Sequence, residues 1–305
     1  MTPDFPQKTV IIIAGPTAVG KTSIAVDLAL DLNTEIISAD SRQCYRELDI
    51  GVARPSPEEL AAVPHHFIAS HSIHEEINAA GFEKYALEKV NELFKKKNTV
   101  VMAGGTGLYI KAFTDGLDPV PQVSSEIRQE IASAYDSGGM EWLHAELTRT
   151  DPQFASKGEM MNPQRMKRAL EVIRATGTSI LEFQKGASAA RDFRIVKTAI
   201  GLPREVLNKR INERVEQMMA KGQLQEAQGL MPFKHLNALR TVGYTELFDY
   251  LDGKTSLEEA VALISQHTRQ YAKRQMTWFK KDPGITWFTP SEGKSLRELV
   301  NSPGK

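Results

Sequence analysis

The chain has 305 residues, of which 41% are hydrophobic and 25% are charged, and this composition indicates a globular protein of about two domains. Its 38 basic and 38 acidic residues cancel, which argues against a protein that coats nucleic acid without regard to sequence. The single cysteine, Cys44, excludes an intrachain disulfide framework and a cysteine-rich zinc module. The amino-terminal residues carry no apolar signal core, and no apolar run approaches the ~18 residues of a membrane span. We therefore expect a cytoplasmic protein that does not enter a membrane.

Short apolar runs in the first third of the chain predict three strands, at Thr9–Ala14, Glu35–Ser38 and Thr99–Ala103. Helical patterns at Lys21 to about Leu32 and at Phe82–Lys97 stand between them. Strands that alternate with helices predict an α/β fold with a parallel sheet, and ligands of such folds bind beyond the carboxyl ends of the strands. All three strand ends are therefore candidate site loops.

The second part of the chain changes character. Residues 124–183 read as short helices broken at Ser137–Gly139 and at Thr176–Thr178, without a strand pattern. Phe193–Leu202 alternates and is β-branched, as a strand that returns to the sheet would be. We therefore expect a P-loop NTPase-like core domain made of residues 1–122 and 191–305, interrupted by a helical insertion domain of residues 123–190.

The most specific motif, GPTAVGKT, follows the first predicted strand and opens a predicted helix. It matches the P-loop pattern in full and in the required context. Its glycines allow backbone N–H groups to face an anion, its lysine adds a positive charge, and its threonine hydroxyl suits Mg²⁺. A nucleoside triphosphate is the commoner ligand of such a loop, and the motif alone does not identify the phosphate ester. The motif comprises Gly15, Pro16, Thr17, Ala18, Val19, Gly20, Lys21 and Thr22, with Thr22 as the expected Mg²⁺ ligand.

The other two strand ends carry polar residues. Asp40 follows the second strand and could bind Mg²⁺ through water, act as a general base, or cap the next turn. The third strand ends in GGTG, which brings the Thr106 hydroxyl to the same edge and permits close approach of a ligand. Its alternative is a tight strand-to-helix turn.

Basic residues gather in two segments, Gln164–Arg174 and His267–Lys281, and aromatic residues interleave the second. Such segments can bind phosphates and stack on bases. Taken alone, such runs are more typical of solvated amphipathic helices.

Six blocks, in order along nearly the whole chain, resemble the bacterial tRNA dimethylallyltransferases, also called tRNA isopentenyltransferases. The blocks are GPTAVGKT (Gly15–Thr22), ISADSRQCYRELDIGVARP (Ile37–Pro55), AGGTGLYIKAF (Ala103–Phe113), NPQRMKRALEVIRATG (Asn162–Gly177), RTVGYTEL (Arg240–Leu247) and TRQYAKRQMTWFK (Thr268–Lys280). The resemblance implies transfer of a dimethylallyl group from dimethylallyl diphosphate to N6 of the adenosine immediately 3′ of the anticodon. The P-loop would then hold the leaving diphosphate with Mg²⁺.

The resemblance also implies roles for individual residues. Asp40 would accept the N6 proton, Thr106 would contact the substrate, and Arg128 would lie near the adenosine and the diphosphate. The partners expected are dimethylallyl diphosphate and the anticodon stem-loop of tRNA, bound by a monomer. The residues expected to contact tRNA are Asp40, Ser41, Arg42, Gln43, Gln164, Arg165, Met166, Lys167, Arg168, Arg240, Gly243, Tyr244, Lys273, Arg274 and Gln275.

Three alternatives remain open on the sequence. An enzyme that prenylates free adenine nucleotides would share the P-loop and the aspartate, but such enzymes lack the helical insertion with its QRMKR block. A P-loop small-molecule kinase could use Arg204, Arg210 and Arg214 as a lid over ATP phosphates. A nucleotide-gated RNA-binding protein without catalysis is the third, and the polar side chains at adjacent strand ends suit a reaction better than a switch.

Overall fold

The computed structural model describes residues 7–186 and 189–292, which form two compact units. The first unit contains residues up to Thr114 and from Arg191 onward, and the second contains Asp115–Ala190. Residues 115–122, expected in the core domain, instead belong by their contacts to the helical unit. No helix in the described ranges is both long enough and apolar enough to cross a bilayer.

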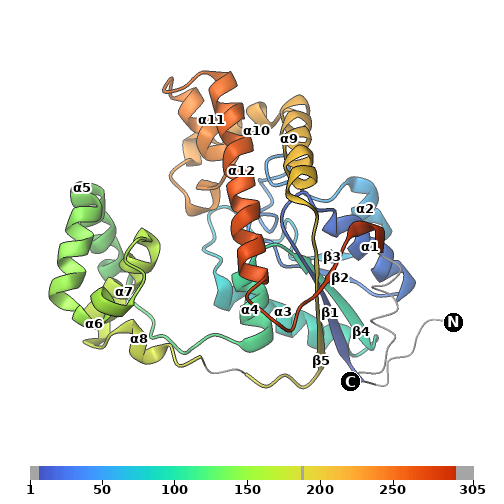
Figure 1. Ribbon diagram of the computed structural model, residues 1–305, viewed down its shortest axis with the longest axis horizontal. Helices are drawn as coiled ribbons and strands as arrows, with labels where there is room; N and C mark the ends of the chain where they lie inside the picture. The colour runs from blue at the N-terminus through green and yellow to red at the C-terminus, as the bar shows by residue number, and fades with distance from the viewer. Residues whose placement is uncertain (1–6, 187–188, 293–305) are drawn as a thin grey trace. The chain divides into compact units, whose positions relative to one another are not determined.

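The first unit is built on a parallel sheet of six strands in the order β3-β2-β4-β1-β5-β6 (Figure 1). The predicted strands are confirmed as β1, β2, β4 and β5, whereas β3 and β6 are not predicted from the sequence. The strands are β1 Thr9–Ala14, β2 Ile36–Ser38, β3 His65–His66, β4 Thr99–Gly104, β5 Arg194–Ile200 and β6 Thr286–Phe288.

Helices cover both faces of this sheet, and β1 is buried along its whole length. Its even-numbered residues, Val10 and Ile12, pack with Phe82 and the rest of the apolar stripe of α3. Its odd-numbered residues, Ile11 and Ile13, pack with the buried face of α1. Because successive side chains of a strand point to opposite faces, a continuous β-branched run is what a doubly covered central strand requires.

Eight helices of at least six residues belong to this unit in the described ranges, and α9 to α12 lie side by side (Figure 1). Several carry sequence-encoded starts, such as the capping boxes at Ser56 and Ser256. The helices are α1 Lys21–Asp31, α2 Pro57–Ala62, α3 Ala79–Leu93, α4 Gly107–Asp115, α9 Arg204–Ala220, α10 Gln223–Leu230, α11 Tyr244–Leu251 and α12 Leu257–Phe279, with 3₁₀ turns at Met231–Phe233, Asn237–Leu239 and Pro290–Glu292.

The second unit is helical, as the sequence predicts. Its core includes Ile131, Leu143, Phe154 and Leu170. Helix α5 (Ser125–Thr150) kinks at Gly139, whose φ is 60°, and α7 (Pro163–Thr176) is capped by Gly177, whose φ is 71°. The two predicted breaks therefore coincide with glycines in the left-handed region. The helices are α5 Ser125–Thr150, α6 Pro152–Lys157, α7 Pro163–Thr176 and α8 Ile180–Phe183.

Candidate active site

The P-loop connects β1 to α1 and has the backbone geometry of an anion-binding turn. Gly15 has a φ of +146°, and a Cβ there would lie 2.6 Å from the Ile200 carbonyl oxygen of β5. Gly20 caps α1 with a φ of +98°, and it contributes no side-chain hydrogen bond to the first turn of the helix. The N–H groups of that turn and the positive end of the helix dipole are therefore arranged to stabilise a phosphate.

Three cations surround this loop. Lys21 Nζ donates to the Pro16 carbonyl oxygen at 2.7 Å, Arg214 Nη1 donates to Thr17 Oγ1 at 3.3 Å, and Arg210 Nη1 donates to the Val19 carbonyl oxygen at 3.3 Å. Both arginines come from α9. From the sequence, a phosphate-binding role is expected for these arginines only in the kinase alternative. Their i, i+4 spacing, which puts them on one face of the helix, was the available signal.

Burial shapes the charge of these groups. Desolvation lowers the pKa of Lys21 to about 8, Asp40 partly offsets that effect, and the charge of Arg214 adds to it. Desolvation likewise lowers the pKa of the Arg214 guanidinium. Two cations that repel each other in a poorly solvated site are both stabilised when an anion binds between them. The electrostatics therefore favour an anionic ligand.

Gln275 of α12 ties the P-loop to the loop after β4. Its Oε1 accepts from Thr17 N at 2.9 Å, and its Nε2 donates to the Gly105 carbonyl oxygen at 2.8 Å. A Cβ on Gly105 would collide with this amide. Gln275 is only 6% exposed. Its side chain therefore suits a role in holding the two loops of the site together better than the expected contact with tRNA.

Asp40 and Thr106 meet at the neighbouring strand ends. Asp40 Oδ1 accepts from Arg42 N at 2.9 Å and from Gln43 N at 3.2 Å, and this is the capping geometry that the sequence left open. Thr106 Oγ1 accepts from Ser41 N at 3.0 Å. The loop after β4 is thereby joined to the loop after β2.

Tyr271 of α12 is a further site residue that sequence reasoning missed. It lines the cleft, and burial, followed by the charge of Asp40, raises its pKa to about 12. It therefore stays a neutral phenol that can donate a hydrogen bond at physiological pH. Its position one helical turn before Gln275 was the available signal.

One cleft of about 710 Å³ is lined by Lys21, Asp40, Arg214, Tyr271 and Gln275, whereas Thr106 and Arg210 are not part of its lining. The P-loop, the end of β4, the loop after β2, and helices α9 and α12 all contribute to its wall. Segments at Asp49–Pro57 and Thr241–Gly243 complete it. The cleft thus joins a cationic end at Lys21 to a carboxylate at Asp40.

Apart from Asp40, Ser41 and Gln275, which are described above, the residues expected to contact tRNA fall into four groups. On α12, Lys273 and Arg274 are exposed, as is Arg240 ahead of α11. The second group consists of side chains with protein partners: Arg42 Nη1 donates to the carbonyl oxygens of Asn237 and Ala238 at 3.0 and 3.2 Å, and Gln43 Nε2 donates to that of Ala53 at 2.9 Å.

The third group is buried. Tyr244 and Met166 are fully buried, Tyr244 beside the cleft and Met166 in the core of the helical unit. Gly243 donates its N–H to Glu246 and has a φ of +99°. The side chains of Tyr244 and Met166 therefore support neighbours that can face RNA and do not face it themselves, whereas Gly243 lines the cleft with its backbone.

The helical unit carries the remaining expected residues. Asn162 caps α7 by accepting from the N–H groups of Gln164 and Arg165 at 3.0 and 3.3 Å. Arg165 is exposed, with an ion pair to Glu159 at 3.8 Å. Lys167 stands 4.7 Å from the centre of the Tyr135 ring.

Two arginines of this unit differ in their surroundings. Arg168 donates to the Pro121 carbonyl oxygen at 3.1 Å and to Glu171 at 3.2 Å. Arg128 lies exposed on α5. The helical unit thus presents basic residues, and the expected role of Arg128 near the diphosphate stays a prediction.

Comparisons with known proteins place this site in a family. The model of the IPP transferase family matches residues 43–282. The tRNA dimethylallyltransferases of Christiangramia forsetii and Cytophaga hutchinsonii are 46% and 42% identical to the chain, over 96% and 98% of its length and 97% and 98% of theirs.

A solved structure from Bacillus halodurans, a full-length tRNA isopentenylpyrophosphate transferase, is 36% identical with a TM-score of 0.71, covering 97% of this chain and 95% of that one. A eukaryotic dimethylallyltransferase acting on tRNA has a TM-score of 0.78 at 24% identity, over 98% of this chain and 81% of that one, and supports the fold alone. With a cationic P-loop joined to an aspartate and a threonine at adjacent strand ends, and with these matches along nearly its whole length, the chain belongs to the IPP transferase family.

Proposed function

We propose that the chain transfers a dimethylallyl group from dimethylallyl diphosphate to N6 of the adenosine immediately 3′ of the anticodon in tRNA, in the reducing cytoplasm. The observation that carries this proposal is the shared cleft, which Lys21, Arg214 and Asp40 all line. A leaving diphosphate needs cations, and an attacking amine needs a base. The family match and the names of the relatives support the same reaction.

The cationic end of the cleft suits the leaving group. As N6 attacks the allylic C1 carbon, the C1–O bond breaks and its electron pair stays on the diphosphate oxygen. The charge of the departing diphosphate is then greatest, so Lys21, Arg214 and the P-loop N–H groups stabilise the transition state more than the bound donor.

Asp40 suits the role of general base. The exocyclic amine is a weak nucleophile because its lone pair is delocalised into the ring, and loss of the N6 proton to a carboxylate assists the attack. Asp40 Oδ1 is held by two backbone N–H groups. Within the described part of the chain no hydrogen bond reaches Oδ2, so Oδ2 is the oxygen that would accept the proton.

The residues present also fit a magnesium ion that binds together with its phosphates. No group of three or more His, Cys, Asp or Glu side chains that could hold a metal occurs among the described residues. Thr22 lines the cleft in the first turn of α1. A site with one protein hydroxyl and substrate phosphates is typical for Mg²⁺, which would neutralise diphosphate charge when bound.

Incubation of the protein with Mg²⁺, labelled dimethylallyl diphosphate and unmodified tRNA should move label into tRNA. Asp40→Asn should lower the turnover of that transfer ~10²- to 10⁴-fold, the usual contribution of a general base, and leave tRNA affinity nearly unchanged. Filter binding measures the affinity, and label incorporation measures the turnover. Turnover of ATP with a small acceptor, without label in tRNA, would instead support the kinase. A tenfold loss of tRNA affinity with near-normal turnover would make Asp40 a binding residue.

Exposed cations should give tRNA binding its salt dependence. Each phosphate contact contributes a slope of about −0.7 to −0.9 to the plot of log affinity against log salt, so Arg165→Ala and Lys273→Ala should each flatten the plot by about that amount. Lys96→Ala is the matched control because Lys96 is exposed just before β4, at the amino-terminal ends of the strands and away from the cleft at their carboxyl ends. Slopes that do not change in either site variant would remove these residues from the RNA contact.

Binding of inorganic diphosphate should report the depressed pKa of Lys21. Below pH 8 the free lysine is protonated and attracts the anion; above pH 8 it must first regain a proton, so its contribution falls about tenfold per pH unit. Calorimetry at fixed Mg²⁺ from pH 6.5 to 9.5 measures the affinity. The same titration with Lys21→Met gives the pH dependence without the lysine, including that due to ionisation of the ligand. The ratio of wild-type to variant affinity should therefore decline above pH 8. A constant ratio would show that Lys21 does not titrate there.

A further inference from the structure

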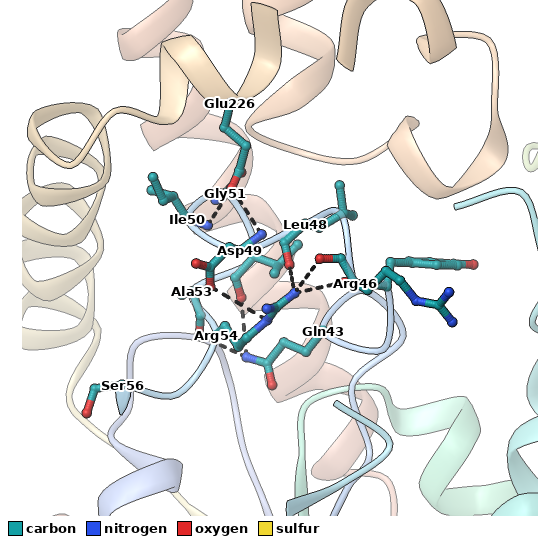
Figure 2. Close-up of polar contacts among 12 residues, drawn as sticks. Gln43, Arg46, Leu48, Asp49, Ile50, Gly51, Ala53, Arg54, Ser56 and Glu226 are labelled. Carbon is teal, nitrogen blue, oxygen red and sulfur yellow. Dashed lines mark hydrogen bonds and ion pairs between the residues drawn. The ribbon is translucent and has the colours of Figure 1, made fainter. Parts of the chain in front are cut away.

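Glu226 of α10 lies outside the lining of the cleft, yet it holds a turn that forms part of the wall (Figure 2). Its Oε2 accepts from Asp49 N at 3.0 Å and from Ile50 N at 2.8 Å. Its Oε1 accepts from Gly51 N at 2.9 Å and from the Tyr244 hydroxyl at 2.5 Å. One carboxylate therefore receives four hydrogen bonds.

This arrangement requires a carboxylate. Three successive backbone N–H groups converge on two acceptor oxygens, and an amide in that place would set its own N–H₂ group against two of the four donors. The pKa of Tyr244 is raised by burial and by the charge of Glu226, which keeps the phenol a donor. A Cβ on Gly51 would lie 2.6 Å from Tyr244 Cζ, so the turn packs directly against this ring.

The turn belongs to a loop, residues 40–54, that is closed by its own hydrogen bonds (Figure 2). Gln43 Nε2 donates to the Ala53 and Val52 carbonyl oxygens at 2.9 and 3.3 Å. Arg54 Nη2 donates to the Tyr45 carbonyl oxygen at 3.0 Å and also to that of Leu48. These contacts make the loop a single structural unit.

Asp40 stands at one end of this loop. Gln43, whose side chain holds the far side of the loop, also donates its backbone N–H to Asp40 Oδ1 at 3.2 Å, beside the N–H of Arg42 at 2.9 Å. Glu226 holds the loop farther along, at residues 49–51. A chain of hydrogen bonds and backbone therefore connects Glu226 to the carboxylate that faces the cleft.

We propose that Glu226 is a positioning residue for Asp40, acting through the 40–54 loop to orient the carboxylate toward the amine that it deprotonates. This role rests on the function proposed above. Glu226 does not touch the P-loop end of the cleft, which is held separately by Gln275 and Arg214. Its removal should therefore affect turnover and leave the binding of a diphosphate unchanged.

A double-mutant cycle on prenyl transfer to tRNA tests this role. Glu226→Gln in the otherwise wild-type protein should lower kcat about tenfold, as a disrupted set of buried charged hydrogen bonds would. In the Asp40→Asn background the same substitution should lower kcat less than about twofold, because a residue that acts through Asp40 has nothing left to orient. Calorimetry should show that the affinity for Mg²⁺–inorganic diphosphate is unchanged.

Two further variants keep the test decisive. Tyr244→Phe removes one of the four hydrogen bonds and keeps the ring, so it replaces Glu226→Gln if that variant does not fold, with a smaller loss that also disappears in the Asp40→Asn background. Glu88→Gln, an exposed glutamate on α3, is the matched control and should leave kcat unchanged. Equal losses in both backgrounds, or an unaltered kcat, would overturn the role of Glu226. A wild-type protein that transfers no label to tRNA would instead refute the proposed function.

Discussion

The site depends on one buried amide that joins two strand ends. Gln275 accepts from the P-loop and donates to the loop after β4, and it lies on α12, which packs against α9 and α11. Because its two hydrogen bonds have little exposure to water, water competes poorly for the amide. The two bonds therefore fix the distance between the loops. From there the hydrogen bond between Thr106 and Ser41 carries the connection to the loop that holds Asp40. The anion site and the carboxylate are thus parts of one bonded framework.

Electrostatics then separate the two ends of the cleft. Lys21 and Arg214 both have lowered pKa values because burial disfavours their charge, and both stand next to the P-loop. Asp40 offsets part of this cost at Lys21, and its negative charge adds to burial in raising the pKa of Tyr271. In a reaction that moves negative charge toward the P-loop, the cations at that end would stabilise the charge. The carboxylate at the other end would accept the proton.

Much of this arrangement follows from the sequence, for reasons that the structure makes explicit. β1 could be predicted because a β-branched run is needed in a doubly covered strand, and the proximity of Asp40 and Thr106 follows because carboxyl ends of parallel strands share an edge. The two-residue strand β3 and the three-residue strand β6 carry too few residues for a period to be read. Whether Tyr244 or Gln275 is buried depends on how distant helices pack, and local sequence does not encode it. The role of Glu226 depends on a turn that lies 175 residues away in the chain.

Our proposal for the P-loop is that it holds the diphosphate of a prenyl donor and not a nucleotide. It is tested most directly by titrating the protein, with Mg²⁺, against dimethylallyl thiolodiphosphate, an unreactive analogue of the donor, and against ATP. We expect the analogue to bind more tightly than ATP, excess inorganic diphosphate to displace it, and Lys21→Met to abolish its binding. Tighter binding of ATP, or analogue binding that persists in Lys21→Met, would contradict this proposal.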